Sequence, residues 1–509
     1  MTANREMPSA GAPRPSAERL RRCLEIAGQI LIALVAVAHP ALFGWLPPFA
    51  DGRATMDVSL AEFLLIAPAL LLFPLAVAIL LLKPAPFSLR KALPFLLGGL
   101  FFLFVLLQIL PLPDDLHRAL SPASRPLMDD SLALASDDPG GPRTLSILPH
   151  DTLIALLRFG AALSVFLASF VVIRSRKDLL RVAVPVVGAG ALLAFLGMIK
   201  ALASLQGGTS LAFLFPEGGG GTRASGPFIN ANQFAGLMEI LFPVSIALLA
   251  WVLHVARREG ESLKATLRRL SGPGARAVLL ALASLLMAGA VLVSQSRLGI
   301  LSFLAGGGVL AVLLTGKSRM RWRAMAAGTL VVLGFFLYLG LQPVLDRYAL
   351  LVEVDEVDRI RAWKMGAEIA GDFPLTGTGL GTFRRIAPLY QPPDLHGGYF
   401  QTHNDYLNMA SDVGLPGLAL LLGMAAAWIA AVFPGLKRHG RLRPAFTAAV
   451  LASFCAVAVH SFGDFNLQVT PIAVHLALIA GLGMAAASLP DVDAGREKDV
   501  PVFEKGDPS

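Results

Sequence analysis

The sequence has few charged residues for its length. Only 15% of its 509 residues are Asp, Glu, Lys or Arg, whereas hydrophobic residues make up 55%. A soluble protein has roughly 25% charged residues, which it needs to cover its surface. The composition therefore excludes an ordinary soluble enzyme and a disordered protein. It indicates an integral membrane protein that crosses the bilayer several times.

Cysteine is also scarce. The chain has two cysteines, Cys23 and Cys455, and both lie at or within apolar stretches. This argues against a disulfide framework and against a cysteine-based metal site. The net charge is +8, which in a soluble protein could indicate nucleic-acid binding. In a membrane protein basic residues gather in cytoplasmic loops, so we expect membrane lipid and no nucleic acid as a partner.

Long apolar runs are what the sequence has in abundance. Twelve stretches are long enough to cross a bilayer, which takes ~20 largely apolar residues. We expect helices, because lipid cannot satisfy an open backbone and the runs show no strand alternation. The first stretch could also be a cleaved signal peptide, but it is longer than the apolar core of one. The predicted spans are 24–47, 58–82, 92–112, 151–173, 180–203, 229–256, 277–294, 298–316, 324–342, 414–435, 444–461 and 470–489.

The distribution of Lys and Arg predicts the orientation of these spans. With the N-terminus in the cytoplasm, the short inside loops hold 21 Lys and Arg, and the much longer outside loops hold 12. Such a bias places both termini in the cytoplasm. The predicted parts are a disordered cytoplasmic tail at 1–23, nine spans within 24–342 with an outer loop at 113–150, a large outer loop at 343–413, three spans within 414–489 and a cytoplasmic tail at 490–509.

The large outer loop contains three recognisable pieces. Residues 359–372 have the spacing of an amphipathic helix, and residues 402–411 predict a second short helix. Residues 374–382 (PLTGTGLGT) form a Gly-rich turn, and the absence of a strand–helix context favours a tight turn over a nucleotide site. The apolar face expected for the first helix consists of Ile360, Trp363, Ala367 and Ala370.

Four polar segments fall on the predicted outer side. Polar groups are costly inside hydrocarbon, so such clusters at helix ends usually line a cavity. Because all four lie on one side, we expect a single site that opens near the outer membrane–water boundary. The segments are 222–236 (TRASGPFINANQFAG), 294–297 (SQSR), the 343–413 loop and 460–466 (HSFGDFN).

The segment THNDYLNMASDVGLPG carries the most informative motif. It has the pair His403-Asn404, then nine residues, then Gly414 and Gly417. This pattern resembles the signature of the O-antigen ligase and O-antigen polymerase superfamily of bacterial membrane glycosyltransferases. The resemblance covers roughly 220–475. Four further segments are similar to other elements of that family: 226–236 (GPFINANQFAG), 294–301 (SQSRLGIL), 359–383 (RIRAWKMGAEIAGDFPLTGTGLGTF) and 460–471 (HSFGDFNLQVTP).

The resemblance implies both a fold and an activity. The fold would be an all-α polytopic membrane protein of about twelve helices with a large helical extracytoplasmic loop, a GT-C-like architecture. The activity would be an inverting transfer of a glycan from an undecaprenyl-pyrophosphate donor to a sugar hydroxyl, at the periplasmic face of the inner membrane. A ligase would use the lipid A core as acceptor, a polymerase a lipid-linked repeat, and a third subtype a protein. Neither a metal nor another cofactor is expected.

The same resemblance suggests which residues carry the chemistry. His403 is the candidate general base, because histidine titrates near pH ~6.5. Arg297 and Arg359 are the candidate clamp on the pyrophosphate, and Arg361 could replace Arg359, because a guanidinium presents a fork of donors to phosphate oxygens. Further candidates for substrate contact are Asn404, Asn230, Asn232, Arg158, Lys200, His460 and Asp464.

Structural roles compete with these assignments. Asn404 could cap a helix, and His460 and Asp464 could pair with each other. Arg158 and Lys200 lie within predicted spans, where a charge is usually functional but could also pair with an acid.

Two other functions suit twelve spans. One is a transporter or flippase for lipid-linked oligosaccharides, and the other is a non-catalytic scaffold of an envelope complex. A transporter places ionisable groups near the bilayer midplane and often has repeated halves, and neither feature is clear in this sequence.

Overall fold

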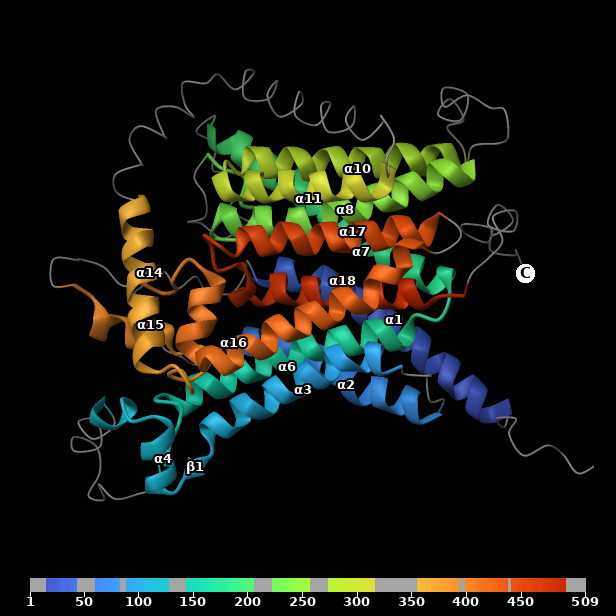
Figure 1. The fold of residues 1–509 in the computed structure, drawn as a ribbon. Coiled ribbons are helices and arrows are strands. Elements are labelled where there is room, and N and C mark those ends of the chain that lie inside the picture. Colours follow the sequence, from blue (N-terminus) through green and yellow to red (C-terminus); the bar gives the residue numbers. More distant parts are fainter. Residues whose placement is uncertain are drawn as a thin grey trace, which may run out of the picture.

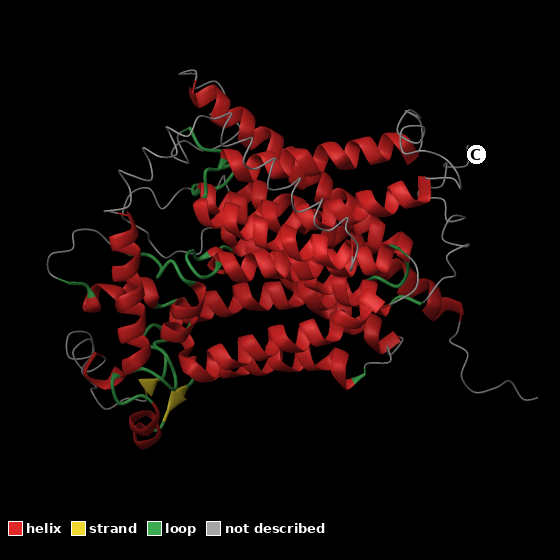
Figure 2. Cartoon of the chain, turned by 45° about the horizontal axis from the view of Figure 1, so that its top comes forward, coloured by secondary structure: helices red, strands yellow, loops and turns green. Residues whose placement is uncertain are grey.

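The structure is a bundle of long helices with a smaller group of elements across one end (Figures 1 and 2). It is a computed structural model. The secondary structure that it shows is helical except for β1 (Pro111–Leu112) and β2 (Arg143–Thr144), which pair antiparallel. The described residues are 15–43, 60–82, 88–127, 143–205, 222–256, 273–315, 355–392, 399–437 and 441–490.

Within the described ranges, ten helices are long and apolar enough to cross a membrane, and α2 is apolar over the shorter stretch Ile66–Leu82. The chain is therefore a multi-pass membrane protein. Eleven of the twelve predicted spans coincide with these helices, and the remaining one, 324–342, lies outside the described residues. The helices are α1 (Pro15–Phe43), α2 (Leu60–Leu82), α3 (Leu89–Ile109), α6 (Pro149–Val172), α7 (Arg176–Leu205), α8 (Ala231–Ala256), α10 (Pro273–Val293), α11 (Arg297–Thr315), α16 (Asp405–Val432), α17 (Leu442–His460) and α18 (Thr470–Ser488).

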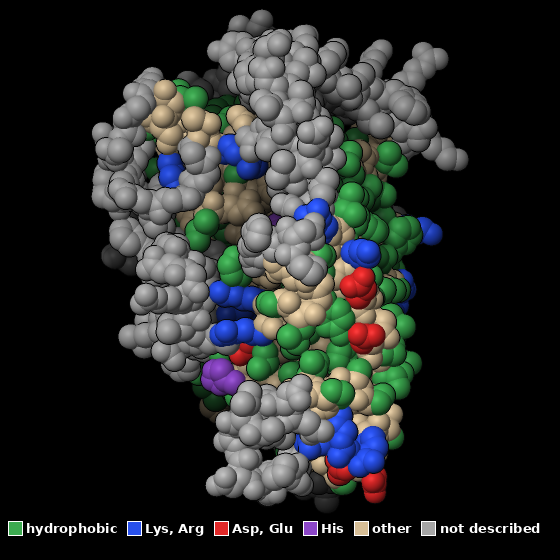
Figure 3. Space-filling view, turned by 90° about the vertical axis from the view of Figure 1, so that its left-hand side faces the viewer, with side chains coloured by type: hydrophobic (Ala, Val, Ile, Leu, Met, Phe, Trp, Pro, Cys, Tyr) green, Lys and Arg blue, Asp and Glu red, His purple; other side chains and the backbone are tan. Residues whose placement is uncertain are grey.

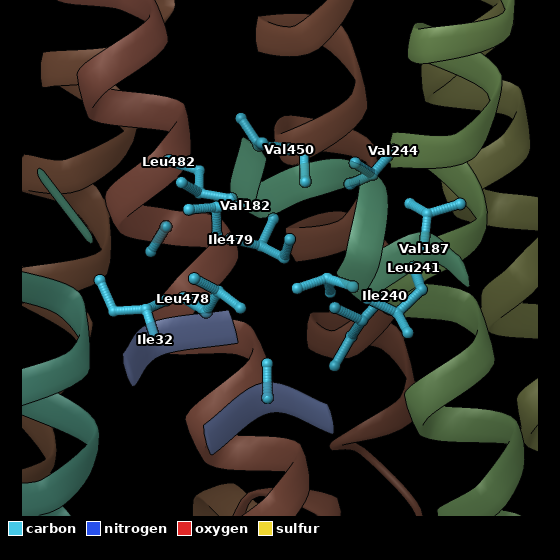
Figure 4. Packing of buried hydrophobic residues seen from close by; sticks show 14 of the residues in the cluster. Ile32, Val182, Val187, Ile240, Leu241, Val244, Val450, Leu478, Ile479 and Leu482 are labelled. Atoms are coloured by element: carbon cyan, nitrogen blue, oxygen red, sulfur yellow. The ribbon is translucent and has the colours of Figure 1, made fainter. Parts of the chain in front are cut away.

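The core of the bundle lies where α1, α7, α8, α17 and α18 meet (Figure 4). Aliphatic side chains such as Ile32, Val187 and Leu478 fill it and are almost fully buried. Leucines on the outer faces, such as Leu285, are instead exposed, as expected for helices that face lipid. Small residues let helices approach closely: a side chain at Gly481 of α18 would collide with the backbone of α6.

The smaller group of elements consists of α4 (Asp114–Leu120), α14 (Asp355–Asp372), α15 (Phe383–Ile386) and the 3₁₀ helix η1 (Ala387–Tyr390). Helix α14 runs across the end of the bundle (Figure 1). Its own small core contains Ile369, Phe373, Phe383 and Ile386. A further apolar cluster, which includes Leu380 and Val413, joins this group to α3 and α6.

Helix α16 connects the two parts. The predicted short helix 402–411 and the predicted span 414–435 are continuous in the structure, with one break at Gly414, where φ is +66°. The first part of α16 lies beside α14, and the rest runs through the bundle to η2 (Phe433–Lys437). The start of α1 and the end of α18 both lie at the opposite end from α14 (Figure 1).

Candidate active site

Segments that are far apart in the sequence meet at the end of the bundle that carries α14. Arg223 joins two of them: Nε donates to Ser294 O at 2.7 Å, and Nη2 donates to Asn232 Oδ1 at 2.9 Å. A side chain at Gly236 of α8 would collide with Asn466 in the 3₁₀ helix η3 (Asn466–Gln468), so these elements are in direct contact. Figure 3 shows a hollow in this end, with Lys and Arg side chains on its rim.

His403 has an unusual backbone conformation. Its φ is +53°, a region that few residues other than glycine occupy. Hydrogen bonds on both sides hold it there: Thr402 Oγ1 donates to Asn404 O at 2.6 Å, and Trp363 Nε1 donates to His403 O at 3.2 Å. A strained residue persists only where its surroundings over-determine it, and such residues cluster at functional sites.

Asn404 begins helix α16. Its side-chain Oδ1 accepts from Tyr406 N at 3.0 Å and from Leu407 N at 3.1 Å, which makes it the N-cap. Its Nδ2 donates to Phe462 O at 3.1 Å. The amide is thus occupied within the protein, and this geometry supports a structural role: Asn404 orients the residue before it and ties the helix start to the loop 461–469.

His403 faces a buried carboxylate. Its Nδ1 lies 3.7 Å from Asp464 Oδ1, an ion-pair distance that is too long for a hydrogen bond. The side chain of His403 is 29% exposed and that of Asp464 is 1% exposed, and the ring of Phe465 contacts the imidazole edge-on. Burial opposes ionisation of Asp464, but His403, His460 and Arg359 outweigh it and lower the pKa of Asp464 to about 2.

Helix α14 contacts the two segments that carry this pair. Arg359 Nη1 donates to Gly463 O at 3.0 Å, directly before Asp464 in the chain. Trp363 bonds the carbonyl of His403, as described above. Residues four apart lie on the same face of a helix. One face of α14 therefore contacts both the His403 segment and the Asp464 segment, which accounts for the four-residue spacing between Arg359 and Trp363.

The predicted apolar face of α14 is wrong. Ile360 is 62% exposed and Ala367 is also exposed. Trp363 is only partly buried, and its indole Nε1 donates to His403 O. Alanines occur on both faces of this helix, so the pattern alone was ambiguous, and packing on the small outer core decides the outcome. The buried stripe consists of Ala362, Met365, Ile369 and the following Phe373.

The Gly-rich turn attaches the outer elements to α16 and α3. Asp412 of α16 accepts from Gly381 N and Phe383 N, each at 3.0 Å. Gln108 of α3 donates to a carbonyl of the turn at 2.6 Å. Gly377 has φ +64°, and a side chain there would strike the backbone of Asp412. Amides of the turn are thus bonded to protein, as expected for a structural turn and not for a phosphate loop.

The other predicted contact residues surround this centre. Arg297 is the first residue of α11 and lies two residues after Gln295, whose φ is +51°. Arg297 and Arg361 are both half-buried. Asn232 N donates to Asn230 Oδ1 at 2.8 Å, so Asn230 shapes the entry to α8.

The two charges predicted within spans are half-buried. Lys200 lies near the end of α7 and its carbonyl accepts from Ser204 Oγ at 3.0 Å. Arg158 of α6 interacts electrostatically with Asp151, so it has the acidic neighbour that the sequence left open.

Residues 282–422 match the family model for O-antigen ligase (Wzy_C). The chain carries an O-antigen ligase domain. The match covers Arg297, α14, the Gly-rich turn and His403. It is shorter than the resemblance over 220–475. No match is found among curated proteins.

Some residues of the candidate site lie outside the part of the chain that matches the family model. Asp464 follows α17, beyond residue 422, and α8 precedes residue 282. Asp405, two residues after His403, accepts from Ser461 Oγ at 2.9 Å and from Leu467 N at 3.2 Å. The domain and the loop 461–469 thus form one unit around His403.

Behind the His403–Asp464 pair lies a second pair that includes a residue the sequence reasoning missed. His460 Nδ1 is 2.8 Å from Glu239 Oε1 of α8, and both side chains are fully buried. The predicted pairing of His460 with Asp464 is therefore corrected: each has a different partner. An acid inside the predicted span 229–256 is the signal that points to Glu239, because buried acids are rare in membrane helices.

Proposed function

We propose that the O-antigen ligase domain transfers a glycan from an undecaprenyl-pyrophosphate donor to a sugar hydroxyl, at the periplasmic face of the inner membrane. The helices then form a GT-C-like bundle of about twelve spans, with both termini in the cytoplasm. The observation that carries this proposal is the accessible imidazole of His403, which is held by a strained backbone and faces the ionised, buried Asp464.

The proposed reaction is a single displacement with inversion. The acceptor hydroxyl loses its proton to His403, and its oxygen forms a bond to the anomeric carbon of the donor sugar. The bond between that carbon and the pyrophosphate oxygen breaks, and undecaprenyl pyrophosphate leaves. Asp464, 3.7 Å away, supplies the counter-charge to the imidazolium that forms.

Arginine side chains are proposed to stabilise the leaving pyrophosphate. Arg359 uses one nitrogen on Gly463 O, and a guanidinium carries five N–H donors, so capacity remains for phosphate oxygens. Arg297 at the start of α11 is the second candidate. In this scheme the arginines supply the positive charge, and no divalent metal takes part.

The first prediction concerns His403. Replacing it by Ala removes the base, and we expect transfer to fall by a factor on the order of 100 to 10,000. The measurement is product formation from purified protein, lipid-linked donor and acceptor, beside protein level in the membrane. His254→Ala, at the other end of α8, is a matched control that should retain activity. Normal transfer by His403→Ala would contradict the catalytic assignment.

The envelope glycans of a strain that lacks this protein would identify the acceptor. A lipid A core capped with a single repeat would indicate a polymerase. Bare core, with long polymer left on the carrier lipid, would indicate a ligase. A normal lipopolysaccharide ladder would direct the assignment to an exopolysaccharide or to protein glycosylation.

A further inference from the structure

The fully buried pair of Glu239 and His460, here called the inner pair, lies behind the site among the membrane helices. Glu239 belongs to α8, and His460 is the last residue of α17. His460 Nδ1 is 2.8 Å from Glu239 Oε1, and neither side chain is exposed. Within the described residues, the remaining polar atoms of these side chains, Glu239 Oε2 and His460 Nε2, have no hydrogen-bond partner. Each group therefore depends on the other, because an unpaired buried charge is costly.

His460 also lies close to Asp464. One tight turn joins the two residues, since Gly463 N donates to His460 O at 3.2 Å and Asp464 follows Gly463 directly. The positive charge of His460 acts on the Asp464 carboxylate, and the negative charge of Asp464 acts on Glu239. The side chain of Asp464 is only 1% exposed, so water and salt screen these interactions little. The inner pair is therefore within electrostatic reach of the Asp464 carboxylate.

The inner pair and the outer pair, His403 and Asp464, form one series of alternating charges once His403 takes up a proton. In order the series is Glu239, His460, Asp464 and His403. Of these four side chains, that of His403 is 29% exposed and the other three are at most 1% exposed. A buried imidazolium keeps its charge only beside a counter-charge, and a cation in turn stabilises a buried carboxylate as an anion. The Glu239 carboxylate thus maintains the charge on His460, and His460 maintains that on Asp464.

We propose that Glu239 and His460 are positioning residues of the transfer site: the inner pair keeps the Asp464 carboxylate ionised and in place for its role beside His403. The inference rests on the proposed function, in which His403 takes a proton from the acceptor hydroxyl. Both residues of the inner pair are fully buried, so they act through Asp464 and not on the substrate. Arg359 of α14 and Asp405 of α16 also interact with this carboxylate, so the inner pair supplies a part of its stabilisation.

The first test is a double-mutant cycle in transfer by the purified full-length protein. Glu239→Gln keeps the shape of the side chain and its capacity for hydrogen bonds but removes its charge. We expect kcat to fall on the order of tenfold, with unchanged KM for donor and acceptor. In protein that already carries Asp464→Asn, the same change should cause no further loss, because both residues act through one carboxylate. Losses that multiply, or an unchanged kcat when Asp464 is intact, would overturn the inference.

A second variant separates the charge of the inner pair from its part in folding. Glu239→Gln with His460→Gln leaves two neutral side chains that can bond to each other, so no unpaired charge stays buried. This variant should unfold at a higher temperature than His460→Gln alone, yet its kcat should be as low as that of Glu239→Gln. A wild-type kcat would show that the pair is structural only. Ser245→Ala is the matched control in α8: it removes a buried 2.8 Å contact with Ser284, and it should keep the wild-type kcat.

An infrared measurement on protein in nanodiscs tests the charge without turnover. A protonated carboxyl gives a C=O band that a carboxylate lacks, and the band of Asp464 is identified by its loss in Asp464→Asn. In wild type this band should appear as the pH falls towards about 2. In Glu239→Gln protein it should appear at a higher pH, because a neighbouring cation is lost; the same pH in both proteins would overturn the inference. If the band shifts but wild type transfers no glycan to any acceptor, the proposed function fails while the effect of the inner pair on Asp464 stands.

Discussion

At the scale of single residues, the site depends on one charge in an unusual place. Asp464 is buried and yet ionised, because His403, His460 and Arg359 outweigh the cost of its burial and lower its pKa to about 2. The carboxylate lies on the Nδ1 side of His403. A buried anion beside an accessible imidazole can orient the ring and gives the imidazolium formed during the reaction a counter-charge.

The second prediction removes this charge. Asp464→Asn keeps the shape of the side chain, and we expect transfer to fall on the order of 100-fold, because the imidazolium loses its counter-charge. The rate at saturating donor measures this effect, and His403→Ala gives the baseline. A variant as active as wild type would show that Asp464 has no part in the proton transfer.

The Asp464→Asn variant also tests how the stability of the fold depends on pH. A carboxyl whose folded pKa lies below its unfolded value of about 4 stabilises the fold above that pH. For Asp464 this contribution is lost as the pH falls towards about 2. Wild type should therefore unfold at a higher temperature than Asp464→Asn at neutral pH, and the difference should narrow below about pH 4. A difference that grows on acidification would contradict the assignment.

At the scale of elements, α16 performs two tasks because it breaks at Gly414. The part before the break presents His403 to the loop 461–469, and the part after it enters the bundle. The break has a positive φ, and a side chain at Gly414 would lie 2.8 Å from the backbone of Pro374 and Leu375. Leu415 N donates to Pro374 O at 2.8 Å, which bonds the break to the Gly-rich turn.

The third prediction compares two glycines of this helix. Gly414→Ala should destabilise the protein by about 1–3 kcal/mol, because both the conformation and the space favour glycine. Gly423→Ala is the matched control, since its new side chain would meet only Leu97 at an ordinary 3.7 Å. Thermal unfolding in detergent measures both variants. Equal unfolding temperatures would show that the break at Gly414 does not constrain the fold.

The elements differ in how far the sequence could predict them. Apolar runs defined the spans well, because a membrane leaves few alternatives to a helix of about this length. The buried face of α14 could not be predicted, since alanines lie on several faces and only the packing of Phe373 and Phe383 selects one. The sequence could not predict the partners of His403 and His460 either, because tertiary contacts between distant segments bring Asp464 and Glu239 to them.

At the scale of the whole molecule, the two ends of the bundle carry different parts of the chain. The end with α14 and α15 carries the start of α16 and with it His403, and the other end carries both ends of the described chain (Figure 1). The excess of Lys and Arg in the loops at the latter end predicts that it faces the cytoplasm.

The fourth prediction tests this orientation. In a protein whose two native cysteines are replaced by Ser, single cysteines are placed at Ala367 of α14 and at Ser88 before α3, both of which are exposed. A membrane-impermeant maleimide should label the Ala367→Cys protein in intact spheroplasts and the Ser88→Cys protein only after permeabilisation. The reverse pattern would place α14 in the cytoplasm and exclude transfer in the periplasm.

The length of the helical stretch between Asn404 and Gly414 also sets the direction in which His403 faces. An α-helix turns by about 100° and advances by about 1.5 Å with each residue. One residue inserted into the nine between Asn404 and Gly414, or removed from them, would therefore rotate His403 away from Asp464, while the membrane helices stayed in place. Substitutions that keep the helix would leave that direction intact. Apart from Asp405 and Asp412, which bond to the loop 461–469 and to the Gly-rich turn, residues in the interval should tolerate substitution far better than the interval tolerates a change in its length.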